Sequence, residues 1–175
     1  MLFDLTVIPE IMDFRYFAVL ILGMYTREEI SRQKQAFWTA LGRYMQPVLS
    51  AEGLPVNWLN YKTGIGGINF KMEVERDHAV IMILLSHSNA GVQQSHYDQL
   101  IRLKGMLQDS LGEDDWIWQQ AEMEMAGKRQ SSISKTLKGV NIHNQPDWAA
   151  IISFLKPRII ALDEFWSMAK HSFEQ

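Results

Sequence analysis

The stretch INFKMEVERDHAVIMILL, residues 68–85, decides the fold class of this chain. In residues 68–75 every second side chain is apolar, which predicts a strand with one buried and one wet face. Arg76 and Asp77 mark a turn, and residues 79–85 are then all apolar. Such a run is long for a half-exposed strand and typical of a central strand covered on both faces. The stretch therefore predicts two neighbouring strands of one sheet.

The rest of the chain shows the same two periods, about 3.6 residues for a helix and about 2 for a strand. Helices are predicted at residues 26–51, 88–111 and 148–173, and further strands at residues 56–62, 115–123 and 130–137. In the last helix the apolar residues hold their phase through Pro157, which predicts a continuous, kinked helix. Glycines at residues 63–67 and 126–127 supply the two hairpin turns. The order α-β-β-β-α-β-β-α predicts a single α+β domain with a mainly antiparallel sheet packed by helices.

Composition narrows the classes of protein to consider. The chain has 175 residues, 47% hydrophobic and 21% charged, as expected for one soluble globular domain. Lys and Arg number 17 against 20 Asp and Glu, a net charge of −3, so no positive excess attracts phosphate backbones non-specifically. The absence of cysteine excludes disulfides, thiolate metal sites and cysteine nucleophiles.

Residues 1–23 differ in character from the rest of the chain. Their apolar run, residues 16–22, is too short for a membrane span, and the acidic residues before it do not fit a secretory signal. Thr26 and Glu29 have the spacing of a capping box that opens a helix. We therefore expect residues 1–23 to be an extension outside the domain at residues 24–175, either an upstream in-frame addition created by start-site choice, with Met24 as the natural first residue, or a weakly packed arm. We also expect a cytoplasmic protein without membrane contact.

Three stretches resemble a known bacterial family. They are YTREEISRQKQAFWTALGRYM (residues 25–45), NWLNYKTGIGGINFKMEVERD (57–77) and VNIHNQPDWAAIISFLKPRIIALDEFW (140–166). The family is domain of unknown function 4268, and the resemblance covers residues 24–173. It implies no established activity. Some members carry the domain behind a nuclease-like segment, which implies a nucleic-acid or defence context.

An enzyme is one hypothesis for the function. The predicted αβββαβ beginning is the core order of the restriction-endonuclease-like fold, whose sites hold Mg²⁺ with carboxylates and use a nearby lysine to activate water. The wet face of the second strand offers Lys71, Glu73 and Glu75, whereas the third strand has no charged residue. The sequence leaves open a divalent-metal-dependent, nuclease-like enzyme with a degenerate core and Mg²⁺ as its cofactor.

A binding or interaction module without a catalytic centre is the favoured hypothesis. Basic and aromatic residues lie on or near the two hairpins, a combination that single-stranded nucleic acid binding uses. The candidate contacts are Lys62, Lys71, Lys128, Arg129, Lys135, Trp58 and Trp116. The five histidines lack the spacing of metal ligands, so neither a metal nor another cofactor is expected under this hypothesis. The candidate partners are nucleic acid and a second copy of the chain, docked through the wide apolar stripe of the last helix.

Overall fold

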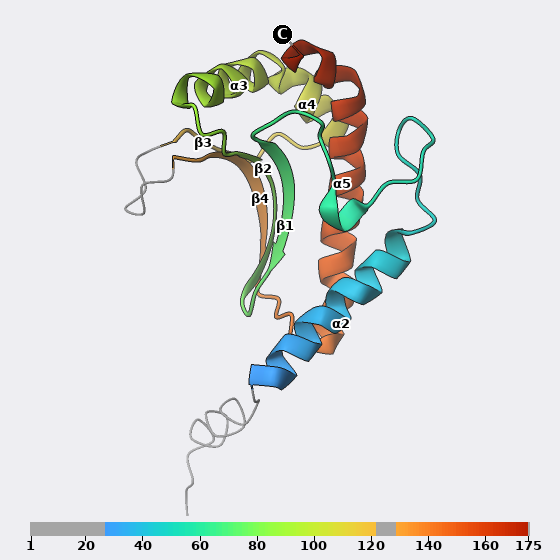
Figure 1. Ribbon diagram of the computed structural model, residues 1–175. Helices are drawn as coiled ribbons and strands as arrows, with labels where there is room; N and C mark the ends of the chain where they lie inside the picture. The colour runs from blue at the N-terminus through green and yellow to red at the C-terminus, as the bar shows by residue number, and fades with distance from the viewer. Residues whose placement is uncertain (1–26, 122–128, 175) are drawn as a thin grey trace, which may run out of the picture.

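One curved antiparallel sheet organises the residues that the computed structural model describes, 27–121 and 129–174 (Figure 1). Its strands are β1 (Ile68–Val74), β2 (His78–Leu85), β3 (Ile117–Gln119) and β4 (Ser131–Lys138). They lie in the order β1-β2-β4-β3, and every neighbouring pair is antiparallel. The predicted α+β class and antiparallel sheet are confirmed.

Helices cover one face of this sheet. They are α2 (Arg27–Met45), α3 (Ala90–Arg102), α4 (Lys104–Leu111) and α5 (Trp148–Ala169), with short 3₁₀ turns η1 (Trp58–Asn60), η2 (Gln145–Asp147) and η3 (Lys170–Phe173). The sheet curves away from α5, so that α5 lies along its convex face and α3 lies beyond one end of it (Figure 1). None of the described helices lies over the concave face.

The hydrophobic core lies between the convex face and α5. From β2, the side chains of Ile81, Ile83 and Leu85 are fully buried, and Leu155 and Phe165 of α5 are equally inaccessible. Burying side chains of this size stabilises the fold by about 1.5–3 kcal/mol each. The apolar stripe of the last helix is therefore used mainly inside its own domain.

Helix α5 runs through Pro157 without interruption, as predicted. Proline has no N–H to donate within the helix. One turn away, the guanidinium of Arg158 donates to the carbonyl of Phe154 over 2.7 Å and lies over the Phe154 ring. The side chain of Arg158 thus adds contacts to the helix next to its proline.

The strand predicted at residues 56–62 is wrong. That segment forms the turn η1, in which the side chain of Asn57 accepts the backbone N–H of Asn60. The indole N–H of Trp58 donates to the carbonyl of Val48 over 2.9 Å, and the ring is buried. The buried Trp58 therefore belongs to an irregular loop, although its apolar side chain is also typical of a strand. Because this strand is missing, the αβββαβ order is not confirmed.

Two further expectations need correction. Strand β2 alternates between buried and half-buried residues, so it is covered on one face rather than two. The helix predicted at residues 88–111 is divided at Leu103, whose backbone (φ −93°, ψ 8°) leaves the helical region. The extension at residues 1–23 and the turn at residues 126–127 lie outside the described residues.

Candidate binding surface

The concave face of the sheet, here called the open face, is the most distinctive surface of the described structure. Strand registers align side chains of the same face across all four strands. The open face consists of Asn69, Lys71, Glu73, Val80, Met82, Leu84, Ile117, Gln119, Ser132, Ser134 and Thr136. Its centre, on β2, is apolar and half-buried, and its flanks carry hydroxyl, amide and charged groups.

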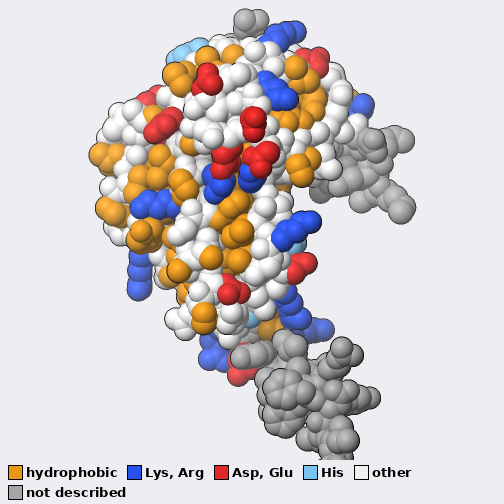
Figure 2. Space-filling model, turned by 180° about the vertical axis from the view of Figure 1, so that it is seen from behind, with side chains coloured by type: hydrophobic (Ala, Val, Ile, Leu, Met, Phe, Trp, Pro, Cys, Tyr) orange, Lys and Arg blue, Asp and Glu red, His pale blue; other side chains and the backbone are white. Residues whose placement is uncertain are grey.

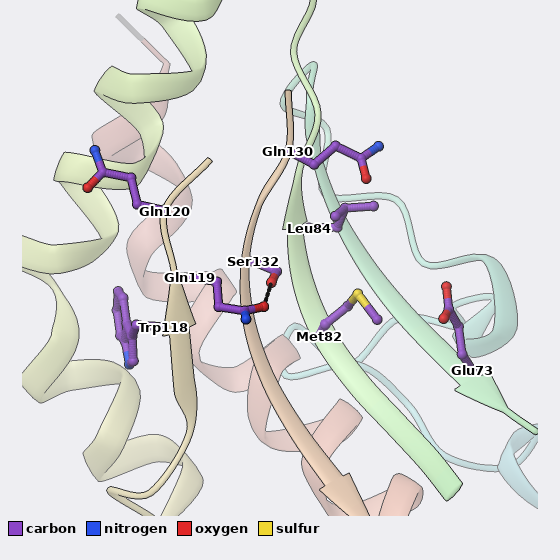
Figure 3. A pocket seen from close by; sticks show the side chains of 8 residues that line it. All are labelled: Glu73, Met82, Leu84, Trp118, Gln119, Gln120, Gln130 and Ser132. Atoms are coloured by element: carbon purple, nitrogen blue, oxygen red, sulfur yellow. Dashed lines mark hydrogen bonds between the residues drawn. The ribbon is translucent and has the colours of Figure 1, made fainter. Parts of the chain in front are cut away.

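A hollow of about 700 Å³ lies over this face. It is lined by Glu73, Met82, Leu84, Trp118, Gln119, Gln120, Gln130 and Ser132 (Figure 3). The Ser132 hydroxyl lies 3.5 Å from the Gln119 side-chain oxygen, a long contact beside the backbone pairing that joins β4 to β3. Three amide side chains and one hydroxyl therefore surround an apolar floor, and a cavity of this size is in the range of ligand sites.

The β3 side of the hollow is held by contacts with α3 and α4. The amide of Gln120 donates to Gln94 over 2.8 Å. Trp118 makes an edge-to-face contact with Tyr97 of α3, with ring centroids 6.2 Å apart, and the ammonium of Lys104 lies 5.4 Å from the Trp118 ring. These contacts fix the shape of the short edge strand, which has only three residues of its own.

A buried amide holds the end of the sheet nearest α3. Gln93 is 2% exposed, and its side chain donates to the carbonyls of Leu85 and Arg129 over 2.5 and 2.8 Å. This bridge joins the end of β2 to the residues that enter β4. A second hollow of about 530 Å³ lies beside it and shares Gln130 with the first, so polar surface continues past the end of the open face.

Comparison with known proteins gives a family but no activity. The family model of a domain of unknown function (DUF4268) matches residues 33–170. The chain belongs to this family. No curated protein and no solved structure shows significant similarity to the chain. Within the described part of this DUF4268 chain, no helix combines the length and the apolar character needed to cross a bilayer.

The residues predicted for a nuclease-like site do not come together in the DUF4268 domain. Lys71 and Glu73 project from the open face, whereas Glu75 forms an ion pair with Lys34 of α2 over 2.7 Å. Among the described residues, no three His, Asp or Glu side chains converge closely enough to hold a metal ion. A carboxylate engaged with α2 is poorly placed to share a metal with Glu73.

The two tryptophans predicted to contact nucleic acid are parts of the core. Trp58 is 3% exposed and Trp116 is 6% exposed. Their indole N–H groups are used within the domain, by the carbonyl of Val48 and by the carboxylate of Glu113 over 2.8 Å. In this conformation neither ring presents a face on which a base could stack.

The predicted basic contacts of the DUF4268 domain are dispersed. Lys135 pairs with Asp115 and lies 3.9 Å from Glu113; hydrogen bonding from Lys135 lowers the pKa of the Asp115 carboxyl. Glu113 also pairs with Arg158. Figure 2 shows the result on one face, where acidic and basic side chains of the described residues gather side by side rather than as a basic patch.

The remaining basic candidates lie on different parts of the molecule. Lys62 lines a small hollow beside α5, and Lys71 projects from the open face. Arg129 is exposed next to the second hollow. Lys128 lies outside the described residues. The described basic candidates therefore form no single track along which a phosphate backbone could run.

Sequence reasoning missed the residues that line the hollow, among them Met82, Gln119, Gln130 and Ser132. A signal existed in the hydroxyl residues that alternate along β4, beside an apolar run in β2. Combining the two signals requires knowing that β4 pairs with β2, and that pairing joins segments about 50 residues apart.

Proposed function

We propose that this DUF4268 domain is a non-catalytic interaction module that binds a segment of another polypeptide on its open face. The observation that carries the proposal is the hollow of about 700 Å³, with its apolar floor and its rim of amide and hydroxyl groups. The floor consists of Met82 and Leu84 of β2, and Gln119, Gln130 and Ser132 contribute the rim.

The chemistry of this lining fits a polypeptide. Amide and hydroxyl side chains both donate and accept hydrogen bonds, as a peptide backbone does. Methionine adapts its shape to varied apolar side chains, and for that reason it is frequent on surfaces that bind peptides. A phosphate backbone would instead require several free cations, and Lys71 lies on this face beside the carboxylate of Glu73.

A selection from a displayed library of random 12-residue peptides tests the proposal. We expect the wild-type domain to enrich peptides that a Met82→Glu variant binds at least about 10-fold more weakly, because a carboxylate in the apolar centre of an interface must be desolvated. The matched control is Met168→Glu, at a residue 57% exposed on α5. This variant should keep the wild-type affinity.

Three results would overturn the proposal. The first is a selection without enrichment, and the second is equal loss of binding in both variants. The third comes from a thermal-shift series with Mg²⁺, Mn²⁺ and short single- and double-stranded DNA. Salt-sensitive stabilisation by DNA that Lys71→Glu abolishes would replace the proposal with nucleic-acid binding, and metal stabilisation lost in Glu73→Gln would replace it with the metal-dependent enzyme.

A further inference from the structure

The two hollows that share Gln130 form one groove, here called the joint groove. Alternation along a strand places Ser86, which directly follows β2, on the same face as Met82 and Leu84. The Ser86 hydroxyl accepts a hydrogen bond from the Asn69 side chain of β1 over 3.3 Å and lines the second hollow. The second hollow therefore begins on the open face, where the first hollow ends.

One acidic and one basic side chain line the two parts of the joint groove. Glu73 is the only charged residue among those that line the first hollow, and it lies apart from Gln130 (Figure 3). Arg129 is the only Asp, Glu, Lys or Arg among those that line the second hollow. Both side chains are exposed, and none of the ion pairs between described residues includes either of them. Lys71 also projects from the open face, but it lines neither hollow.

The strand register sets the distance between these two charges. Glu73 lies opposite Val80 of β2. Arg129 lies near the end of β2, because its carbonyl and that of Leu85 both accept hydrogen bonds from the Gln93 amide. Leu85 follows Val80 by five positions, which is about 17 Å along a strand. An extended peptide rises by the same distance per residue, so side chains that reach both charges should be about four to six residues apart.

We propose that the polypeptide bound in the joint groove carries a Lys or Arg that pairs with Glu73 and an Asp or Glu that pairs with Arg129. The two charged residues of the peptide lie about four to six positions apart, and apolar side chains between them contact Met82 and Leu84. This inference rests on the proposed function and specifies the class of peptide. Opposite charges at fixed positions select a partner, because a like charge at either position is repelled. A nucleic-acid strand is disfavoured, since its phosphates would meet Glu73.

The selection from random 12-residue peptides, repeated with full-chain variants, tests the charge pattern. Wild type should enrich peptides with a basic and an acidic residue at the stated spacing. Glu73→Lys should enrich peptides in which an acidic residue replaces the basic one, and Arg129→Glu should enrich peptides in which a basic residue replaces the acidic one. Glu164→Lys and Arg43→Glu make the same charge changes at exposed residues that line neither hollow, and they should enrich the wild-type pattern.

Calorimetric titration of one peptide from the wild-type selection tests whether each charge meets its partner directly. Glu73→Lys should bind this peptide at least about 5-fold more weakly than wild type does, since an attraction becomes a repulsion. Changing the basic residue of the peptide to Glu should restore its binding to Glu73→Lys. Arg129→Glu should show the same loss, and changing the acidic residue of the peptide to Lys should restore binding.

The charge pattern and the proposed function can fail separately. The inference is wrong if the enriched peptides share no such pair of charges, or if either change in the peptide fails to restore binding. In that case Met82→Glu would still weaken binding, and the proposed function would stand. A selection without any enrichment would overturn both.

Discussion

Asp163 is a buried carboxylate that ties an irregular loop to helix α5. It is 4% exposed and accepts two hydrogen bonds of 2.6 Å, from the backbone N–H of Ala51 and from the hydroxyl of Tyr61. Tyr61 in turn stacks on Phe70 of β1, with ring centroids 5.1 Å apart. Removing this carboxylate should therefore release the loop at two points.

We expect Asp163→Ala to lower the free energy of unfolding by about 2–3 kcal/mol. Hydrogen bonds to a charged group contribute about 1.5–3 kcal/mol each, and the Ala51 N–H would lose its acceptor. Part of this loss is offset because the folded state no longer buries a charge. Tyr61→Phe keeps the ring on Phe70 and should cost about 1–2 kcal/mol.

Urea unfolding followed by tryptophan fluorescence measures these changes. Because the two residues share one hydrogen bond, the double variant should cost about 1–2 kcal/mol less than the sum of the single variants. Glu164→Ala, at an exposed neighbour on α5, serves as the control and should change stability by less than about 0.5 kcal/mol. Strictly additive effects, or an Asp163→Ala protein as stable as wild type, would refute this account of the loop.

The same pair predicts an alkaline dependence of stability. Burial, followed by the Asp163 carboxylate, raises the pKa of Tyr61 above its usual value of 10.0. The unfolded chain then loses the phenolic proton first, so stability that is complete below pH 10 decreases as the pH rises above it. Tyr61→Phe should reduce this decrease in urea titrations at high pH, and an unchanged slope would contradict the assignment.

Two further predictions concern the end of the sheet nearest α3. Burial lowers the pKa of His96 below 6.5, so the stability that is complete above pH 6.5 should decrease as the pH falls. The urea midpoint of wild type should therefore be lower near pH 5 than near pH 7, and His96→Gln should make this difference smaller. Gly67 has a φ of +83°, and a Cβ added there would lie 2.9 Å from the Cα of His87. Gly53 has a similar φ, but a Cβ added there would meet no atom within 4 Å. Gly67→Ala should therefore lower the thermal midpoint by at least about 4 °C more than Gly53→Ala does.

Many of the helices and strands can be predicted from the spacing of apolar residues along the sequence. The alternation in β1 and the phase of α5 through Pro157 are each set by neighbours in sequence, and both are present as predicted. The apolar run of β2 does form a strand, but only one of its two faces is covered. The strand predicted around Trp58 is wrong because its buried ring belongs to an irregular segment: the indole N–H donates to the carbonyl of Val48, ten residues earlier, and residues 58–60 form a 3₁₀ turn.

The candidate site was harder to predict because it depends on pairing between distant segments. Gln119 and Ser132 line one hollow with Met82 only because β4 lies between β2 and β3. Likewise, the sequence does not show that Lys135 is paired, because its partner Asp115 lies 20 residues away and is brought beside it only by the fold. The sequence of β2 also does not show which of its faces is half-exposed, because the side chains on that face are as apolar as the buried ones.

The position of α5 along the chain has a consequence for synthesis on the ribosome. All four strands precede α5 in the sequence, and α5 supplies the opposite side of the core that covers them. Until α5 has emerged, Ile81, Ile83 and Leu85 lack the surface that buries them. Transiently exposed apolar strands are the segments that aggregate or engage chaperones. The nascent domain should therefore remain unfolded through most of its translation and should complete folding only when its last long helix becomes available.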